Sequence, residues 1–352
     1  MTHPAMWIAV DAMGGDQAPR TVVEGACRAA VEDGIPVLLV GHRERIEAEL
    51  ERLRACPPPG RRAGRIEIVH AADVVGMDEP AVTPLRRKPD SSIRRAVELV
   101  REGRARALVT AGNTGAALIA AKVVIGTVPG VDRPALAAVL PNAVARTVLL
   151  DIGANVDTRP VHLREFAVMG DSYAREVLGV ERPRVGLLSI GVEASKGSDL
   201  SREVFKSLQG AGLDFVGNVE GGDVFSGRAD VVVCDGFVGN AVLKSAEALA
   251  DLATRLLAKE LRATRRTRLG FLLARPALER FRINTDYAEY GAAPLLGLAG
   301  GCFIAHGRSN PRAIQSAVRR AVEFAQADVH LKIRDRLAEL HSQDERVLGQ
   351  PA

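Results

Sequence analysis

The sequence is poor in aromatic residues and cysteines, and it has no large excess of charge of either sign. Aromatic residues make up 4% of the 352 residues, and the four cysteines lie far apart without a Cys-x-x-Cys pair. This spacing excludes a disulfide framework and a zinc knuckle, and it predicts reduced thiols in a cytosolic protein. Lys and Arg number 47 against 43 Asp and Glu, so a nucleic acid is not an expected partner of the chain as a whole.

Several short motifs that identify enzyme classes are also missing. No Gly-x-Gly-x-x-Gly follows a strand pattern, and no Gly-x4-Gly-Lys-[Ser/Thr] occurs, which removes the main support for a dinucleotide or P-loop site. There is no His-Glu-x-x-His and no Gly-x-Ser-x-Gly, so zinc-protease and serine-hydrolase chemistry are unsupported. Carboxylates are not grouped as a metal site requires, and we expect no metal.

Long hydrophobic runs are absent as well. The apolar run at residues 6–10 is too short for a signal peptide. Residues 290–307 carry no formal charge, but five glycines and Pro294 make them a poor helix, so we expect no membrane span.

Apolar strand patterns and amphipathic helix patterns alternate along most of the chain. This alternation predicts an α/β fold with a doubly wound, mostly parallel sheet covered by helices on both faces. The expected strands are Trp7–Val10, Pro36–Val40, Ile66–His70, Ala107–Thr110, Thr147–Leu150, Val185–Ile190, Asp214–Val219 and Val231–Cys234. The expected helices are Thr21–Glu32, Arg43–Arg54, Ser91–Glu102, Thr114–Ile125, Leu163–Leu178, a long one from about Val238, and one after Asn310-Pro311. Residues 337–352 are expected to be a polar, frayed tail.

Loops that combine glycine with Asp, Asn, Ser or Thr follow five of these strands. Ligands of doubly wound sheets bind beyond the carboxyl ends of the strands, so we expect the five loops to line one cleft, although each alone could be a turn or a helix cap. They cover residues 11–16, 110–115, 151–155, 217–222 and 235–240.

Three basic positions are candidates for binding an anion at this edge. Residues 86–88 place three cations before a helix start that offers Ser91 and Ser92, which suits phosphate, although a solvated surface run has the same appearance. Lys196 and Lys244 could reach the same cleft or point into solvent. Cys234 ends an apolar strand without a neighbouring His, and we interpret it as a buried thiol.

The motifs of the chain resemble those of the bacterial phosphate acyltransferases of phospholipid synthesis, the acyl-(acyl-carrier-protein):phosphate acyltransferases. The resemblance covers about residues 7 to 327. It rests on the collinear segments IAVDAMGGDQAP, PLRRKPDSSIRRAVELV, TAGNTGAALIAA, GVDRPALAAVLPN, LLDIGANVDTRPVHLREFAVMG, RVGLLSIGVEASKG, FVGNVEG, DVVVCDGFVGNAVLKSAE, EYGAAPLLGLAGG and AHGRSN. The chain departs from the family pattern at Thr110, where Ser is usual, and at Ser189 and Val192, where Asn and Glu are commoner.

The resemblance implies a fold like phosphotransacetylases and isopropylmalate-type dehydrogenases, a homodimer, and no metal or organic cofactor. It implies transfer of a long acyl chain from acyl carrier protein to inorganic phosphate, which gives acyl phosphate for phospholipid synthesis. A membrane glycerol-3-phosphate acyltransferase is a further expected partner. Residues 1–336 would form the two-lobed α/β domain with the cleft between its lobes. Two alternatives stay open: a phosphotransacetylase that uses acyl-CoA, and a non-catalytic scaffold for carrier protein and membrane.

Phosphate is itself a nucleophile, so the enzyme would need to hold it, align it with the thioester and stabilise the oxyanion. The catalytic residues we expect are Asn113, Asn155 and Asn218 as neutral donors near the thioester carbonyl, Lys196 as a cation for phosphate, and His306 as proton donor to the leaving thiolate. The residues we expect around phosphate are Arg87, Lys88, Ser91, Ser92, Gly112, Thr114 and Lys244, together with Lys196.

Residues 255–282 form the one strongly basic segment, with nine basic residues against two acidic ones. Leucines at helical spacing and Pro276 predict a projecting hairpin of two helices with an apolar tip. We expect this hairpin to dock acyl carrier protein, an anionic membrane surface, or both, which would make the protein cytoplasmic and peripherally membrane-associated; the alternative is an ordinary helix pair with a solvated face. The expected docking residues are Arg262, Arg265, Arg266, Arg268, Leu269, Phe271, Leu272 and Leu273.

Overall fold

A single large sheet organises the chain. The structure is a computed structural model that describes residues 6–53, 65–264, 266–267, 270–276, 278 and 291–348. Within these residues, eleven strands form one sheet in the order β3-β2-β1-β4-β11-β10-β5-β6-β9-β7-β8. Their bounds are β1 Ile8–Asp11, β2 Val37–Gly41, β3 Ile66–His70, β4 Ala107–Thr110, β5 Ala135–Pro141, β6 Arg146–Leu150, β7 Arg184–Leu188, β8 Asp214–Val219, β9 Val231–Val233, β10 Ala293–Leu296 and β11 Gly301–Ile304.

The sheet consists of two parallel groups that run in opposite directions. Strands β3, β2, β1, β4 and β11 are parallel to one another, and so are β6, β9, β7 and β8. Between the groups lie three antiparallel junctions, β11–β10, β10–β5 and β5–β6. The two groups therefore run in opposite directions. The glycine loops at residues 110–115, 151–155 and 235–240 nevertheless contribute residues to one groove, whereas those at 11–16 and 217–222 contribute none to its described lining. Our expectation that all five loops line one cleft is thus met only in part.

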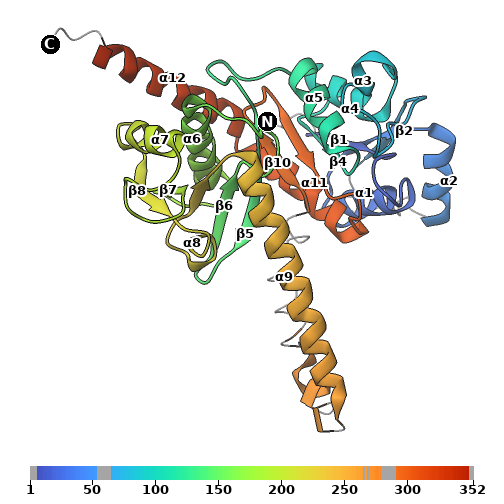
Figure 1. The fold of residues 1–352 in the computed structure, drawn as a ribbon. Helices are drawn as coiled ribbons and strands as arrows, with labels where there is room; N and C mark the ends of the chain where they lie inside the picture. The colour runs from blue at the N-terminus through green and yellow to red at the C-terminus, as the bar shows by residue number, and fades with distance from the viewer. Residues whose placement is uncertain are drawn as a thin grey trace.

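Helices cover both faces of the sheet, as the alternation predicted (Figure 1). Helices α1, α6, α11 and α12 share one buried cluster, and α4 and α5 belong to another. The helix bounds are α1 Arg20–Glu32, α2 Arg43–Leu53, α3 Thr83–Arg86, α4 Ser92–Arg101, α5 Thr114–Val124, α6 Pro160–Glu176, α7 Asp199–Gln209, α8 Asp223–Ser226, α9 Gly236–Ala263, α11 Pro311–Gln326 and α12 Val329–Leu348.

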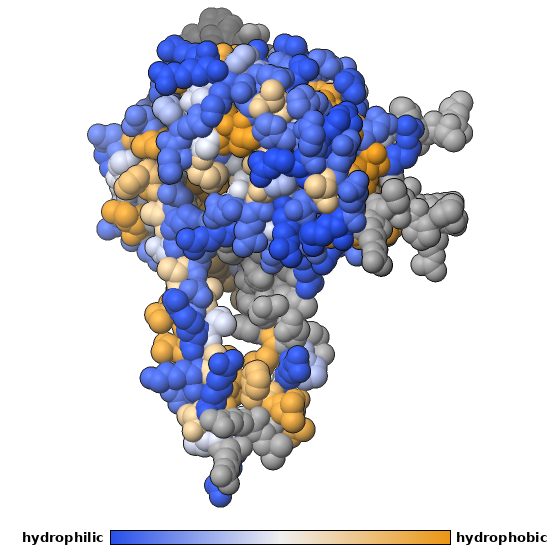
Figure 2. Space-filling view, turned by 90° about the vertical axis from the view of Figure 1, so that its right-hand side faces the viewer, coloured by the Kyte–Doolittle hydropathy of each residue, from blue (hydrophilic) through white to orange (hydrophobic). Residues whose placement is uncertain are grey.

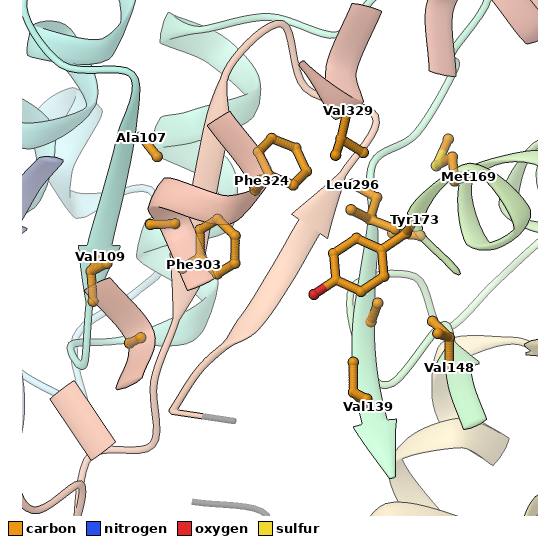
Figure 3. Packing of buried hydrophobic residues seen from close by; sticks show 14 of the residues in the cluster. Ala107, Val109, Val139, Val148, Met169, Tyr173, Leu296, Phe303, Phe324 and Val329 are labelled. Carbon is orange, nitrogen blue, oxygen red and sulfur yellow. The ribbon is translucent and has the colours of Figure 1, made fainter. Parts of the chain in front are cut away.

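The core lies on both sides of the central strands, because successive side chains of a strand point to opposite faces. In Figure 3, Phe303 of β11 faces Phe324 of α11, and their ring centroids are 5.5 Å apart. Leu296 of β10 and Tyr173 of α6 continue the same layer toward the second parallel group. One buried layer thus joins the two groups, although their strands run in opposite directions.

Several segments differ from the prediction, which did not include strands β5, β10 and β11 or helices α3, α7 and α8. Residues 135–141 form β5, which the alternation did not identify because three alanines and a proline weaken its strand pattern. The expected polar tail is also wrong over most of its length, since α12 continues to Leu348 and its Leu337 and Leu340 are buried. These two leucines pack into the cluster that contains α6, so tertiary contact stabilises a helix that composition alone does not favour.

Helix α9 projects from the body of the molecule (Figure 1). It contains the first residues of the segment 255–282, which we predicted to form a projecting hairpin, and part of that segment lies outside the described residues. In the space-filling view of Figure 2, hydrophobic residues gather on this projection, whereas much of the body is hydrophilic. Within the uncharged stretch, the described residues 291–307 contain strands β10 and β11 and no helix. Of the helices that the structure describes, none combines the length and the apolar character that crossing a bilayer requires.

Candidate functional site

A groove of about 830 Å³ crosses the sheet where the two parallel groups meet. Its floor is aliphatic and includes Leu136, Ala138 and Leu140 of β5. Its rim is polar and draws on loops of both groups. The rim residues are Thr114, Asn240, Lys244, Glu247, Asp251, His306, Arg308, Ser309 and Asn310. Three predicted site residues, Thr114, Lys244 and His306, are therefore brought together here.

The glycine loops of the first parallel group pack tightly against one another. A Cβ atom on Gly14 would lie 2.6 Å from the backbone nitrogen of Gly112, so the loops that follow β1 and β4 can approach this closely only because residue 14 is glycine. The loop after β11 joins them, since the backbone nitrogen of Asp16 donates to the carbonyl of Gly307 at 2.9 Å. These contacts place His306 and Thr114 at one end of the groove.

Asn113 has no side-chain donor left for a substrate. Its Nδ2 atom donates to the carbonyls of Gly76, Met77 and Glu79 at 3.3, 2.8 and 2.9 Å. Its Oδ1 atom accepts from the backbone nitrogen of Ala116 and caps α5. The side chain thus ties the 76–79 loop to the start of α5, and these bonds occupy the amide that was expected to stabilise an oxyanion.

The basic turn at residues 86–88 divides into an exposed and a paired cation. Arg87 is exposed. Lys88 donates to Glu79 and to the carbonyl of Val74, and this ion pair lowers the pKa of the Glu79 carboxyl. Neither residue lies among the described residues that line the groove.

Ser91 and Ser92, which we expected to bind phosphate, are both buried. Ser92 and Thr110 bond to the carboxylate of Asp11, and burial raises the pKa of Asp11. Among the described residues, the hydroxyl of Ser91 has no hydrogen-bond partner. Ser92 therefore supports the loop after β1 through Asp11, whereas the Ser91 hydroxyl is buried without a bond to the described residues.

A buried carboxylate organises the loop after β6. Asp151 accepts from the backbone nitrogens of Leu136, Gly153 and Ala154 at 3.0–3.2 Å. It also accepts from both nitrogens of Asn155. Asn155 donates in addition to the carbonyl of Pro134 at 2.8 Å, so its amide hydrogens, like those of Asn113, are used within the protein.

Asn218 and Lys196 are not among the described residues that line the groove. Asn218 is 1% exposed, and its Nδ2 atom donates to the carbonyl of Glu193 at 2.8 Å. Lys196 is exposed on the same loop as Glu193. Because β7 and β8 lie at the end of the sheet order, far from β10 and β5, the structure does not bring these two residues to the groove.

The groove also contains a cation that sequence reasoning missed. The side chain of Arg308 is 86% exposed, and its Nε atom is 4.0 Å from Asp16. Lys244, by contrast, pairs with Glu247 at 2.9 Å. Arg308 belongs to the segment AHGRSN, whose position directly after a strand could have identified it.

His306 beside Arg308 has a defined hydrogen-bonding pattern. Its Nδ1 atom accepts from the backbone nitrogen of Arg308 at 3.1 Å. Because this bond occupies Nδ1, Nε2 is the ring nitrogen that remains to contact a substrate. This leaves His306 able to take the role that we expected for it, beside the leaving thiolate.

The described cysteines are buried thiols. Burial raises the pKa of Cys27 and Cys302 to about 12, and it raises that of Cys234 well above its ordinary value. Cys234 is 4% exposed, which agrees with a small buried side chain and disfavours an acyl-cysteine. Cys56 lies outside the described residues. Within the described residues, no three His, Cys, Asp or Glu side chains are grouped so that they could bind a metal.

The projecting arm consists of α9 and the helical residues 270–276. It carries some of the residues that we expected to dock the carrier protein or the membrane. Its Phe271, Leu272 and Leu273 are 37%, 63% and 77% exposed, and residues 270–276 are helical. Arg262 and Arg266 are exposed on the arm, whereas Arg265, Arg268 and Leu269 lie outside the described residues.

Comparison with known proteins shows close relatives over almost the whole chain. The family model described as "Fatty acid synthesis protein" matches residues 6–332. "Phosphate acyltransferase" from Pelobacter propionicus is 50% identical over 336 residues, 96% of this chain and 95% of that protein. The protein of the same name from Geobacter sulfurreducens is 47% identical over 332 residues, 94% of each chain.

Solved structures with the same fold are more distant in sequence. A phosphotransacetylase from Streptococcus pyogenes has a TM-score of 0.59 at 18% identity, with 92% of this chain and 94% of that chain covered. The EutD phosphotransacetylase from Staphylococcus aureus has a TM-score of 0.58 at 17% identity over the same shares. These likenesses confirm the predicted α/β fold of the phosphotransacetylase type.

Proposed function

Because the chain belongs to the fatty acid synthesis protein family and is an acyltransferase, we propose that it transfers a long-chain acyl group from acyl carrier protein to inorganic phosphate. The product would be an acyl phosphate for phospholipid synthesis. The observation that carries the proposal is the meeting of Arg308, His306, Thr114 and Lys244 in one groove.

The rim of the groove suits phosphate and a developing oxyanion. Arg308 supplies a flexible, exposed guanidinium, and Thr114 lies at the first turn of α5, where the helix dipole favours an anion. His306 offers its Nε2 hydrogen to the oxyanion or to the leaving sulfur. No side chain has to become a nucleophile, because phosphate itself attacks.

The reaction is balanced without a further reactant. An oxygen of HPO4²⁻ bonds to the thioester carbon, the carbon–sulfur bond breaks, and the phosphate proton passes to the sulfur. The products are the acyl phosphate dianion and the free thiol of the carrier. The protein aligns the two reactants and stabilises the charge on the carbonyl oxygen.

The test is acyl phosphate formation, trapped as the hydroxamate with hydroxylamine. We expect product from palmitoyl-acyl carrier protein and less from palmitoyl-CoA at the same concentration. Arg308→Ala should raise the KM for phosphate at least about tenfold, as expected for a lost charge-assisted contact, whereas Lys196→Ala should change it less than twofold. The reverse result would move the phosphate site to the β7–β8 edge, and no hydroxamate from either donor would contradict the proposal.

A docking role for the projecting arm is part of the same proposal. Exposed leucines and arginines on one projection suit an acidic carrier protein and an anionic membrane surface, which would make the protein cytoplasmic and peripherally membrane-associated. Along α9, the exposed Leu249, Leu252 and Leu256 share one face, and a second copy of the chain in a homodimer would cover them. Because an acyl phosphate is reactive, its release beside the membrane would let a membrane glycerol-3-phosphate acyltransferase use it before it hydrolyses.

A further inference from the structure

The floor of the groove is apolar and is built on the antiparallel strands that join the two parallel groups. Leu136, Ala138 and Leu140 alternate along β5 and therefore point to one face of the sheet. Ala137, between them, points to the other face and is fully buried. The strand thus presents a large, a small and a large side chain in succession to the groove.

The neighbouring strand repeats the small side chain at the same level. β10 pairs with β5 so that Leu295 lies opposite Leu136 and Leu296 opposite Ala135. The same register, continued by two residues, places Ala293 opposite Ala138, and both alanines line the groove. Ala138 lies between Leu136 and Leu140 on β5, and Ala293 has Leu295 as its leucine neighbour on the same face of β10. The two adjacent alanines leave a depression in the sheet face, because each lacks the three side-chain carbons that Leu has beyond Cβ.

The depression and the polar rim belong to the same cavity. The floor strand β11 ends at Ile304, two residues before His306, and Ala293 lies opposite Ile304 in the β10–β11 pairing. A molecule whose polar end lies at His306 and Arg308 would place its apolar part over Ile304, Ala293 and Ala138. The cavity volume of about 830 Å³ is within the usual range of about 300–1,000 Å³ for small-molecule sites.

We propose that Ala138 and Ala293 determine which acyl chains the enzyme accepts, because the depression that they form holds the chain beyond the thioester. This inference rests on the proposed acyl transfer to phosphate and names the part of the substrate that the floor recognises. A larger side chain at either position fills the depression, so chains that extend across it lose their contacts. Chains too short to reach it are unaffected.

The test measures the activity of the variants Ala138→Val and Ala293→Val with acyl donors of different chain length. Ala138→Leu is added if that variant folds. Palmitoyl- and butyryl-acyl carrier protein are used with saturating phosphate, and kcat/KM is measured by hydroxamate formation. We expect both valine variants to lose about 10- to 100-fold with palmitoyl, the range for a misfit of one or two methylene groups in an apolar pocket. With butyryl they should stay within about threefold of the original chain. Ala143→Leu, an exposed alanine in the turn after β5, is the matched control and should change neither donor.

Each other outcome has a separate meaning. Equal losses with both donors would place the carrier's pantetheine arm on the floor and overturn the inference, as would an unchanged chain-length profile in variants whose unfolding midpoint in urea is retained. A changed sedimentation coefficient with an unchanged profile would assign the floor to contact between two copies of the chain and overturn it too. Absence of hydroxamate from the unmodified protein would contradict the proposed function itself, which is distinct from these results.

Discussion

The Oδ2 atom of Asp151 accepts two hydrogen bonds from Asn155, at 2.7 Å from its backbone nitrogen and at 2.9 Å from its side-chain nitrogen. With the three backbone donors to Oδ1, this makes the carboxylate the centre of the loop between β6 and α6. We expect Asp151→Ala to lower the free energy of unfolding by at least about 3 kcal/mol, because several buried donors lose their acceptor. Urea denaturation measures the effect, and Asp157→Ala, an exposed position in the same segment, should change it by less than about 0.5 kcal/mol.

Two substitutions of Asn113 distinguish a structural role of this side chain from a catalytic one. Asn113→Asp keeps the oxygen that caps α5 but loses the donors to the 76–79 loop, whereas Asn113→Ala loses both. We therefore expect Asn113→Ala to cost about 2–3 kcal/mol and Asn113→Asp less, measured by urea denaturation. Proteolysis should detect a loosened 76–79 loop in both. If Asn113→Asp had full stability and loop protection but lost 100-fold or more in turnover, the side chain would act on the substrate.

Glu165 predicts how stability depends on pH. Its carboxylate is 3% exposed and accepts from the backbone nitrogen of Asp132 at 3.0 Å, and burial raises its pKa from 4.5 to about 7. The folded state therefore holds the proton more tightly than the unfolded state between these two values, so this group's stabilisation is complete below about pH 4.5 and is lost as the pH rises through about 7. Glu165→Gln removes this titration, and the fall in the free energy of unfolding between pH 5 and pH 8 should be smaller by about 3 kcal/mol. Equal slopes for the two proteins would show that Glu165 does not titrate in this range.

The projecting arm predicts binding to anionic vesicles. Replacing Leu272 and Leu273 with Glu places two negative charges on the exposed apolar helix face and should reduce co-sedimentation with phosphatidylglycerol vesicles at least about tenfold. Turnover at saturating soluble acyl carrier protein should stay within twofold, because Leu272 and Leu273 are not among the described residues that line the groove. Ile190→Glu, at an apolar position on the body that is 82% exposed, is the control and should sediment like the original chain; unchanged sedimentation of the double variant would remove the membrane role.

Arg266→Glu tests the carrier protein at the same arm. If the acidic carrier docks here, the variant should raise the KM for palmitoyl-acyl carrier protein at least about fivefold, because a favourable charge contact becomes repulsive. The KM for palmitoyl-CoA should not change. An unchanged KM for both donors would place carrier docking elsewhere.

The packing of α12 predicts how many carboxyl-terminal residues can be removed before the free energy of unfolding falls. Removing residues 337–352 exposes the surface that Leu337 and Leu340 cover and should cost at least about 3 kcal/mol. Removing only residues 343–352 should cost less than about 1 kcal/mol. Thermal unfolding of the two truncated chains compares them, and equal melting temperatures would contradict the packing of α12 against α6.

Several features of this protein follow from the sequence alone. The alternation of apolar strands such as Val37–Gly41 with amphipathic helices such as α1 determines the α/β class, because local periodicity dictates which face of each element is buried. The glycines at 14 and 112 and the polar residues after each strand identify the loops that carry the site. The composition of residues 255–282 identifies the basic, apolar arm.

Other features depend on contacts between residues that are distant in the chain. The antiparallel strands β5 and β10 reverse the direction of the second parallel group, and no local pattern shows that reversal. Asn218 lies on β8 and Lys196 follows β7, at the far end of the sheet order, so these two residues do not reach the groove. Asn113 and Asn155 have the right chemistry for an oxyanion, but the carbonyls that occupy their amides come from residues 76–79 and from Pro134. Arg308 joins Lys244 in one groove only because β11 returns to pair with β4. The sequence determines which hydrogen-bond donors the side chains carry. The tertiary fold determines which of these donors remain available to a substrate, because it brings internal acceptors within hydrogen-bonding distance of some of them.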